Sequence, residues 1–559
     1  MRLLIVLIAL CVVVQGQEPS VALKSSDEPA TGSITGRVVN ESGQPIAGAS
    51  AFVRRINSST GRTTTTDAEG NFRVNNLDRG LYIITASAAA HITPPSDSGG
   101  LPNYYRIGDS ANLRLVRGGV VTGTVMNSLG EPVVAVRVRA MMIRDVNGRP
   151  PTALFEGLRQ YQTDDRGVYR LWGLLPGTYL VSAGGAGMQQ FNFNPYDFDT
   201  PTYAPSSTRD NAAEITVTSG EENNVDIRYR GEPGYTISGT VKVFAPSNTA
   251  TVSITPANAP LTSAGNIFQP PGARGFAFNG MSDGEYDLVA QEFTPAPGPV
   301  MPSIQLSEPK RVIIKGASVS GIELTTKPLG SVSGRIVLES SKVSECQGKR
   351  PPLLAETLVQ LRRPEKDPEK DTTSNPRVFG MSGSPDPKGT FVLRSLSAGK
   401  YQFEPIFYAR YWYLQSIAMG KTDAAANWTN VRFGEHLSNL TITLAEGAAQ
   451  LRGKWASGEP APGTLLYLVP SEQDKAGDVL RFFVTGIAAD GTFALNSVAP
   501  GRYWVLTQTN NDPQIATMTK LRQPEAAPAR TKLRKTAEAK KTDLELKPCQ
   551  NLTGYELKL

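Results

Sequence analysis

One spacing of glycine, apolar and aromatic residues recurs along the chain and constrains its fold more than any other feature. Aligned on a tyrosine, each copy has a glycine two residues before it, an apolar residue five before, an aromatic residue ten before and a glycine twelve before. The copies with this full spacing begin and end at Gly70 and Tyr82, Gly167 and Tyr179, Gly389 and Tyr401, and Gly491 and Tyr503. A fifth copy ends at Tyr286 and has Arg274 in place of the first glycine. Such repetition indicates an array of similar modules.

The segments before each copy predict strands. Apolar and polar residues alternate in GSITGRVVN from Gly32 and in GVVTGTVMN from Gly119, which is the period of a strand with one buried face. Within the repeated spacing, the first glycine permits a tight turn and the Leu-x-x-Gly segment reverses the chain into a return strand. A closing strand is expected at the end of each unit. The sequence therefore predicts an all-β protein with a short solvated helix in LRQPEAAPARTKLRKTAEAKKTD. Its five modules are expected at residues 32–117, 118–230, 231–327, 328–445 and 446–559.

The motif T-D-x-x-G-x-[FY] followed by G-L-x-P-G-x-Y resembles the carboxypeptidase regulatory-like domain. TTDAEGNFRVNNLDRGLYIITA and QTDDRGVYRLWGLLPGTYLVSA carry the resemblance in modules 1 and 2, and GTFVLRSLSAGKYQF and GTFALNSVAPGRYWV carry part of it in modules 4 and 5. Module 3 lacks the aspartate and the first glycine. The resemblance implies a tandem array of transthyretin-like (prealbumin-like) β-sandwiches, as in exported bacterial proteins. Domains of this fold are described as folding aids, spacers, surface repeats or carbohydrate-binding-like modules, so the resemblance implies a fold and no reaction.

The first residues, MRLLIVLIALCVVVQGQ, are typical of a signal peptide. Arg2 precedes an apolar run that ends at Val14, and we expect cleavage after Gly16, so that residues 1–16 are removed. Cys11 leaves lipidation as an alternative. No later stretch reaches eighteen apolar residues, so no transmembrane segment is expected in the mature chain. We therefore expect an exported protein that is periplasmic, at the cell surface or extracellular.

The charge balance excludes one class of partner. The chain has 57 Lys and Arg residues against 51 Asp and Glu residues, which is too even to favour nucleic acid. The expected partner is an unidentified protein or glycan of the cell envelope. Cys346 and Cys549 are a candidate disulfide, which would contribute about 5 kcal/mol by closing a loop of about 200 residues. The alternative is two separate small buried residues.

Catalytic residues are not evident in the sequence. A zinc carboxypeptidase needs a His-x-x-Glu pair and a later histidine, and neither His91 nor His436 has that spacing. There is no P-loop or paired-cysteine metal signature. An intramolecular Lys-Asn isopeptide bond would need a first-strand lysine, for which Lys242 is the candidate, without an evident asparagine. We expect no enzyme, no cofactor, and no catalytic or metal-binding residue.

Acidic residues before the hairpin glycines raise calcium as an alternative. They are Asp67, Glu69, Asp164, Asp165 and Asp386. Calcium needs six to eight oxygen ligands, and one or two carboxylates at each corner are too few. An aspartate three residues before a turn glycine can instead accept backbone N–H bonds within the turn, which is the favoured interpretation.

Aromatic clusters near loops leave one binding function open. They are YYR at Tyr104 and Tyr105, FNFNPYDF from Phe191 to Phe198, and YARYWYLQS from Tyr408 to Ser416. The candidate ligand-binding side chains are Phe191, Phe193, Tyr196, Tyr411, Trp412 and Tyr413. Strand alternation puts Tyr411 and Tyr413 on the face opposite Trp412, and packing between modules is favoured over sugar binding. The predicted function is a non-catalytic exported scaffold or interaction protein. The alternative is a carbohydrate-binding protein that uses the aromatic loops of modules 2 and 4.

Overall fold

The computed structural model describes residues 31–557, except 57, 59, 95–102, 152–157, 186–187, 190–193, 258–264, 295–302, 365–381, 457–458 and 510–514. The described residues form an all-β array of five sandwich modules, each around its own buried core, with two short α-helices in the last. The predicted fold class is confirmed. The expected signal peptide lies outside the described residues, and among those residues no helix is long and apolar enough to cross a membrane.

Modules 1 and 2 contain the first eighteen strands. Module 1 has β1 (Thr31–Val39), β2 (Ser50–Arg55), β3 (Gly61–Thr65), β4 (Asn71–Asp78), β5 (Tyr82–Ser87), β6 (His91–Ile92), β7 (Ser110–Arg114) and β8 (Val116–Arg117). Module 2 has β9 (Gly119–Met126), β10 (Arg137–Asp145), β11 (Arg159–Gln162), β12 (Val168–Leu174), β13 (Gly177–Ala183), β14 (Met188–Gln189), β15 (Thr202–Tyr203), β16 (Ile215–Val217), β17 (Glu222–Asn224) and β18 (Ile227–Arg228), with 3-10 helices η1 (Pro195–Phe198) and η2 (Arg209–Asn211).

Modules 3 and 4 follow. Module 3 has β19 (Tyr235–Lys242), β20 (Thr249–Pro256), β21 (Gly265–Gln269), β22 (Gly275–Met281), β23 (Gly284–Thr294), β24 (Ser303–Ser307), β25 (Lys310–Ile314) and β26 (Val319–Pro328). Module 4 has β27 (Gly330–Glu339), η3 (Ser344–Cys346), η4 (Leu354–Glu356), β28 (Leu358–Arg362), β29 (Ser382–Gly383), β30 (Thr390–Leu396), β31 (Gly399–Ile406), β32 (Trp412–Met419), β33 (Thr422–Asp423), β34 (Thr429–Val431) and β35 (His436–Glu446).

Module 5 combines strands with the α-helices. Its elements are β36 (Ala449–Trp455), β37 (Thr464–Pro470), η5 (Gln473–Lys475), η6 (Val479–Arg481), β38 (Phe483–Gly486), β39 (Thr492–Val498), β40 (Gly501–Thr509), α1 (Met518–Arg522), η8 (Pro524–Ala526), α2 (Ala527–Lys540), β41 (Asp543–Leu546) and β42 (Asn551–Leu557). The helix was expected to be solvated, but one face packs on the sheet because Leu521, Leu533 and Ala537 join the apolar side chains of β37 and β40 in one buried cluster.

The modules share one strand plan. The first strand pairs antiparallel with the hairpin strand on one side and parallel with the closing strand on the other, as in β4-β1-β7, β30-β27-β35 and β39-β36-β42. The sequence predicts the closing strand but not its parallel pairing. A Cβ added to the central glycine of the first strand would lie well under 3.0 Å from a carbonyl oxygen of the closing segment, for example at Gly123 against Val225 and at Gly239 against Ile322. Glycine is therefore required where the two backbones approach.

The repeated tyrosine fixes the hairpin loop. In each module its buried hydroxyl donates a hydrogen bond of 2.6–3.0 Å to the carbonyl oxygen four residues earlier. The donor and acceptor pairs are Tyr82 and Asp78, Tyr179 and Leu175, Tyr286 and Ser282, Tyr401 and Ser397, and Tyr503 and Ala499. The ring therefore fills the core while its polar tip satisfies a loop carbonyl, which explains tyrosine rather than phenylalanine at this position.

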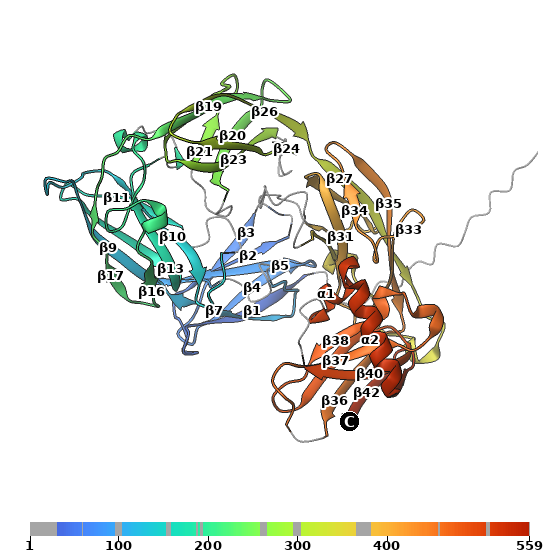
Figure 1. The fold of residues 1–559 in the computed structure, drawn as a ribbon. Helices are drawn as coiled ribbons and strands as arrows, with labels where there is room; N and C mark the ends of the chain where they lie inside the picture. Colours follow the sequence, from blue (N-terminus) through green and yellow to red (C-terminus); the bar gives the residue numbers. More distant parts are fainter. Residues whose placement is uncertain are drawn as a thin grey trace, which may run out of the picture.

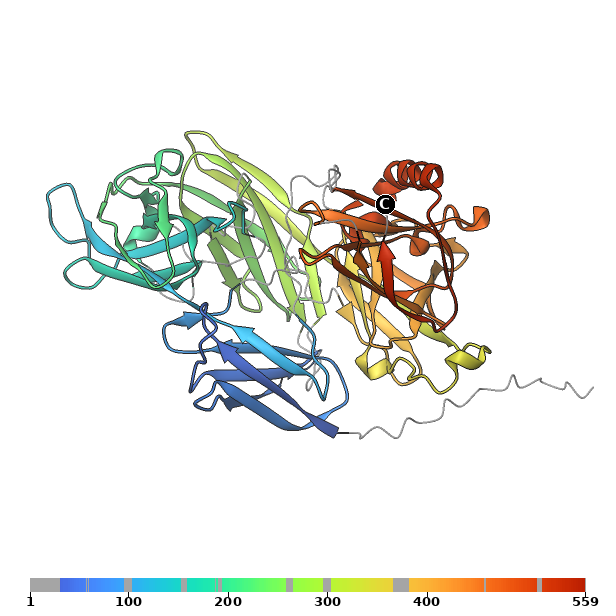
Figure 2. The same ribbon diagram turned by 90° about the horizontal axis from the view of Figure 1, so that it is seen from below.

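The array follows a curved path. Figure 1 shows module 1 (blue) between module 2 (cyan) on one side and module 4 (orange) on the other, with module 3 (green) completing the curve. Figure 2 shows module 5 (red) beside module 4 and away from modules 1 and 2. Module 1 contacts module 4 directly, since the side chain of Gln360 donates a hydrogen bond to Tyr104. Modules that are distant in sequence are therefore neighbours in space.

Candidate functional site

Three of the acidic residues of the hairpins, Asp67, Asp164 and Asp386, are turn acceptors. Asp164 Oδ1 accepts the backbone N–H groups of Arg166 at 3.0 Å and Val168 at 2.8 Å, and Asp67 and Asp386 accept the equivalent pairs in modules 1 and 4. Arg166 also donates to Asp164 Oδ2 at 2.8 Å. This bond first, and the backbone donor from Val168 second, lowers the pKa of Asp164 below its ordinary value. These contacts account for the aspartates without a calcium ion. Among the described residues, no group of three or more His, Cys, Asp or Glu side chains stands together as a metal site.

The aromatic cluster of module 4 is engaged in packing. Trp412 is 1% exposed within the module 4 core, so its ring cannot stack on a sugar, and its candidacy as a ligand-binding residue is corrected. Tyr413 packs against the core of module 5, and burial raises its pKa. Tyr411 carries the ammonium of Lys349 at 4.6 Å from its ring centroid. Its carbonyl oxygen accepts the N–H of Gly447 at 2.8 Å. The cluster therefore joins modules 4 and 5.

The aromatic cluster of module 2 is only partly described. Phe191 and Phe193 lie outside the described residues. Tyr196 packs against the module 2 core and meets the ring of Tyr229 edge to face at a centroid distance of 5.5 Å. Phe198, at the end of η1, remains 51% exposed. The described aromatic rings of this loop therefore include one packed ring and one exposed ring.

The third cluster lies at the contact between modules 1 and 4. Gln360 Nε2 donates to Tyr104 Oη at 2.6 Å. The guanidinium of Arg106 lies 4.3 Å from the centroid of the Tyr408 ring and 3.8 Å from the carboxylate of Glu356. Burial at this contact raises the pKa of both Tyr104 and Tyr408. The described side chains of this contact, named here the 1–4 contact, meet through polar and cation–π interactions.

The junction between modules 4 and 5 is different in chemistry. Cys346 of η3 and Cys549 of the β41–β42 turn form a disulfide with a Cα–Cα distance of 5.3 Å. Val479 and Leu480 of η6 in module 5 enter the core cluster of module 4. The fully buried Gln450 accepts a hydrogen bond from Arg410 Nε at 2.6 Å. This junction, named here the 4–5 junction, continues the module 4 core into module 5.

Possible catalytic groups were also located. Ser331 Oγ contacts His436 Nδ1, but the two residues are register partners on β27 and β35, and His436 is exposed on the sheet surface. Open grooves of about 530 and 730 Å³ lie on the equivalent faces of modules 1 and 5, beside Gly36 and Gly453. The described residues that line these grooves include no histidine or cysteine. The grooves therefore lack a nucleophile and base pair of the Cys-His or Ser-His type.

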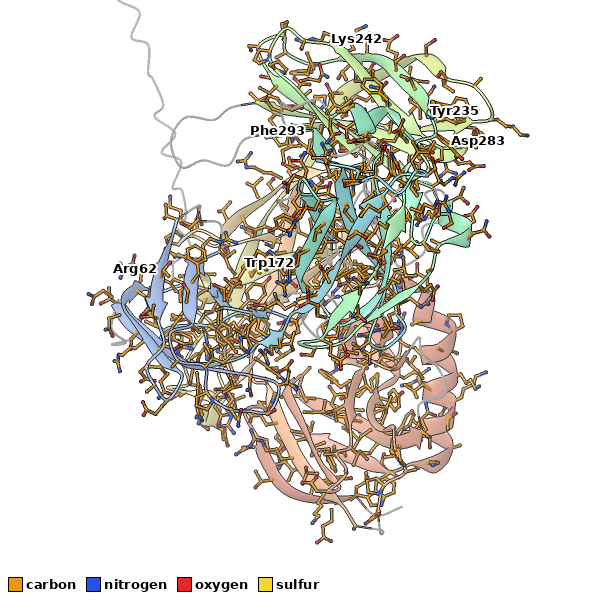
Figure 3. The ribbon with its side chains drawn as sticks, turned by 90° about the vertical axis from the view of Figure 1, so that its left-hand side faces the viewer. Arg62, Trp172, Tyr235, Lys242, Asp283 and Phe293 are labelled. Carbon is orange, nitrogen blue, oxygen red and sulfur yellow. A yellow bond between two sulfur atoms is a disulfide. The ribbon has the colours of Figure 1, made fainter. Side chains whose placement is uncertain are left out.

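The candidate lysine of an isopeptide bond in module 3 lies at the surface, and a buried carboxylate nearby has other partners. Lys242 is exposed at the end of β19, where Figure 3 labels it at the rim of the module. The buried carboxylate of Glu292 instead accepts hydrogen bonds from the N–H of Phe244 at 2.7 Å, from Asn248 Nδ2 at 2.6 Å and from the hydroxyl of Thr326. Glu292 therefore ties the loop after β19 to β23 and β26.

Sequence reasoning missed the polar side of the 1–4 contact. It named Tyr104 in the cluster YYR without assigning a contact to its arginine, and Gln360 and Glu356 carried no motif. Gln360 occupies an ordinary strand position, and its role depends on a module more than two hundred residues earlier. Periodicity within one module contains no signal for such a contact.

Comparisons with known proteins bear on module 1 and on the fold. Residues 33–94 match the family model of the carboxypeptidase regulatory-like domain. No curated protein matches the chain.

Solved structures were also compared. The Bacillus anthracis TIE protein is 16% identical over 53% of this chain and 50% of its own, with a TM-score of 0.15, so this chain spans about half of its length. The minor pilin of Streptococcus agalactiae is 14% identical over 36% of this chain and 96% of its own, with a TM-score of 0.19. The shaft pilin SpaA of Lactobacillus rhamnosus GG is 10% identical over 36% and 98%, with a TM-score of 0.18.

Proposed function

We propose, from the premise that residues 33–94 are a carboxypeptidase regulatory-like domain, that this chain is a non-catalytic exported scaffold of the cell envelope. Its role is to hold protein-binding surfaces in fixed relative positions. One observation carries the proposal. Of the side chains with potential for chemistry, Asp164 is engaged in a turn, Trp412 in a module core and Tyr408 in a contact between modules.

Contacts between modules support a positional role. A chain of independent spacers needs no side-chain contacts between its modules. This chain has a disulfide and a shared apolar core at the 4–5 junction. It also has a cation–π contact between Arg106 and Tyr408 at the 1–4 contact. Interfaces between domains of one chain limit their relative motion when they are extensive and apolar. The apolar, disulfide-bonded 4–5 junction therefore favours a fixed pair of modules over a flexible linker.

A carbohydrate-binding function that uses the module 4 aromatic residues is less well supported. Trp412 is buried in the core, and Tyr413 packs against module 5. Sugar binding there would require the 4–5 junction to open, at the cost of its apolar core. The structure favours packing for this cluster.

The scaffold proposal is tested in the cell envelope and in solution. The chain is expressed with residues 1–16 in a bacterial host, with a photo-crosslinking residue at Phe244 or Ile313, which are 64% and 55% exposed on module 3. We expect recovery in the periplasmic, surface or extracellular fraction, and a discrete crosslinked envelope protein at one of these positions but not with the crosslinker at the buried Ile254. Turnover of peptide, ester, glycosidic or phosphate substrates that is lost in Ser331→Ala would overturn the proposal.

A further inference from the structure

Module 2 has an exposed aromatic pair that belongs to none of the clusters and contacts described above. Trp172 on β12 is 55% exposed, and Tyr161 on β11 is 44% exposed. Their ring centroids lie 6.2 Å apart with an interplanar angle of 34°, so the two exposed rings are a contacting aromatic pair. Figure 3 labels Trp172 on this face of module 2. This pair is named here the Trp172 platform.

Comparison of the modules shows that the fold does not require these rings. Trp172 lies seven residues before the repeated tyrosine, and the residues at that position in the other modules are Asn75, Asn279, Arg394 and Asn496. Two of these asparagines form hydrogen bonds with other residues of their own sheet. Asn75 accepts one from Arg73 Nε at 2.8 Å, and Asn279 accepts one from the hydroxyl of Thr236. The residues in the register position of Tyr161 in modules 1 and 5 are Thr64 and Thr485. Module 2 alone has aromatic residues at both positions among these described modules.

Polar groups lie directly beside the platform. The register of β12, β9 and β17 places Trp172, Val120 and Glu222 in one row across the outer face of the sheet. The next row along the strands holds Arg170, Thr122 and Asn224. The guanidinium of Arg170 donates to Glu222 at 2.8 Å, and both side chains are about half exposed. Neighbouring strands are about 4.8 Å apart, so Glu222, two strands away in the same row, lies about 10 Å from Trp172.

We propose that the Trp172 platform binds a neutral oligosaccharide. One sugar ring stacks its C–H face on the indole and phenol rings, and the next sugar offers hydroxyl groups to Arg170, Glu222 and Asn224. A sugar has a small apolar face surrounded by hydroxyl groups, which matches two aromatic rings bordered by charged and amide groups. A protein partner fits less well, because a stable protein interface buries about 800 Å² on each side and the apolar surface here ends at the Arg170–Glu222 pair. The inference goes beyond the scaffold proposal and does not depend on it.

Titration of the full chain with sugars tests this inference. The probes are cellohexaose, maltohexaose, xylohexaose and chitohexaose, measured by isothermal calorimetry and tryptophan fluorescence. We expect saturable binding of at least one probe, weakened at least tenfold in Trp172→Asn. This variant restores the residue type found at the equivalent position of modules 1, 3 and 5, so we expect it to fold. Tyr161→Thr should weaken binding in the same way.

Matched controls separate this site from other surfaces. Phe198→Ala removes a ring of similar exposure, 51%, from another part of module 2 and should leave binding unchanged. Absence of binding to all four probes, or equal binding by the chain and Trp172→Asn, overturns the inference. Self-association of the chain that is lost in Trp172→Asn would assign the platform to a second copy and would also overturn it. Failure of sugar binding leaves the envelope crosslinks expected of the scaffold unaffected.

Discussion

The 4–5 junction and the 1–4 contact hold modules together by opposite means. The 4–5 junction has a disulfide and the buried side chains of Val479 and Leu480, which belong to the module 4 core. Among the described residues, the 1–4 contact has a hydrogen bond to Tyr104 and a guanidinium that stacks on Tyr408 and pairs with Glu356. A covalent bond and apolar burial make the first a permanent joint. The second is joined by polar contacts of the kind that contribute about 0.5–2 kcal/mol each, and we expect it to be reversible. We therefore expect a fixed C-terminal pair of modules and a curve that opens at the 1–4 contact.

Removal of the disulfide should have the largest effect. The bond closes a loop of 203 residues, so the double variant Cys346→Ser/Cys549→Ser should lose up to about 5 kcal/mol in the free energy of unfolding. The cause lies in the greater freedom of the unfolded chain, so native contacts at the junction should persist. Chemical denaturation of the unchanged chain and of the double variant, followed by signals from modules 4 and 5, measures the difference in the free energy of unfolding. An unchanged denaturation midpoint would contradict this account of the junction.

Truncation of the apolar side chain that enters the module 4 core should have the next largest effect. Leu480 is 6% exposed, and Leu480→Ala should cost about 2–5 kcal/mol because it leaves a cavity in a packed core. Leu129 is 80% exposed, so Leu129→Ala should change stability by less than about 0.5 kcal/mol. Equal losses in the two variants would show that Leu480 does not stabilise the junction.

The 1–4 contact should respond more weakly and in a different observable. Tyr408→Ala removes the ring beneath Arg106, a contact that contributes about 1–2 kcal/mol when partly desolvated. We expect the closed arrangement to become about 5–30 times less favoured over the open one without loss of module stability. Distances between labels at the exposed Asn112 and Lys388, introduced as non-canonical residues, report the opening.

A matched variant tests whether this response belongs to the 1–4 contact. Lys349 lies over the ring of Tyr411 at 4.6 Å, which is the same kind of contact within the fixed pair of modules. Lys349→Ala should leave the label distance unchanged. A similar opening in both variants would refute the difference drawn between the two regions.

The same contrast explains what the sequence could predict. The repeated spacing that ends at Tyr82 and Tyr503 predicts the hairpins because a turn glycine and a core aromatic residue act within about twelve residues of each other. The turn role of Asp164 follows from equally local chemistry. The burial of Trp412 was not predicted, because alternation in YARYWYLQS does not say which face meets the core. The 1–4 contact pairs residues that are 256 apart, so its polar partners carry no local pattern.

The smallest expected effect concerns the titration of Tyr104. Burial at the 1–4 contact raises the pKa of this phenol above its ordinary value of 10.0, while the hydrogen bond from Gln360 lowers it to a smaller extent. Burial of the protonated Tyr104 phenol therefore stabilises the closed arrangement fully below about pH 10. This stabilisation is lost as the pH rises through the raised pKa of Tyr104. In Tyr408→Ala, which opens the contact, the pKa of Tyr104 should fall toward 10, as measured by NMR of Cζ-labelled tyrosine.

Gln360→Ala separates the two causes by the sign of the change. If burial alone keeps the contact closed, loss of the donor raises the pKa of Tyr104 further, whereas opening of the contact lowers it. We expect the pKa of Tyr104 to fall, because the 2.6 Å hydrogen bond from Gln360 directly joins modules 1 and 4. Tyr413, whose pKa is raised by burial at the 4–5 junction, serves as the internal reference. A fall in the pKa of Tyr413 in Gln360→Ala would mean that the 4–5 junction opens together with the 1–4 contact. The distinction between a fixed and a reversible joint would then be wrong.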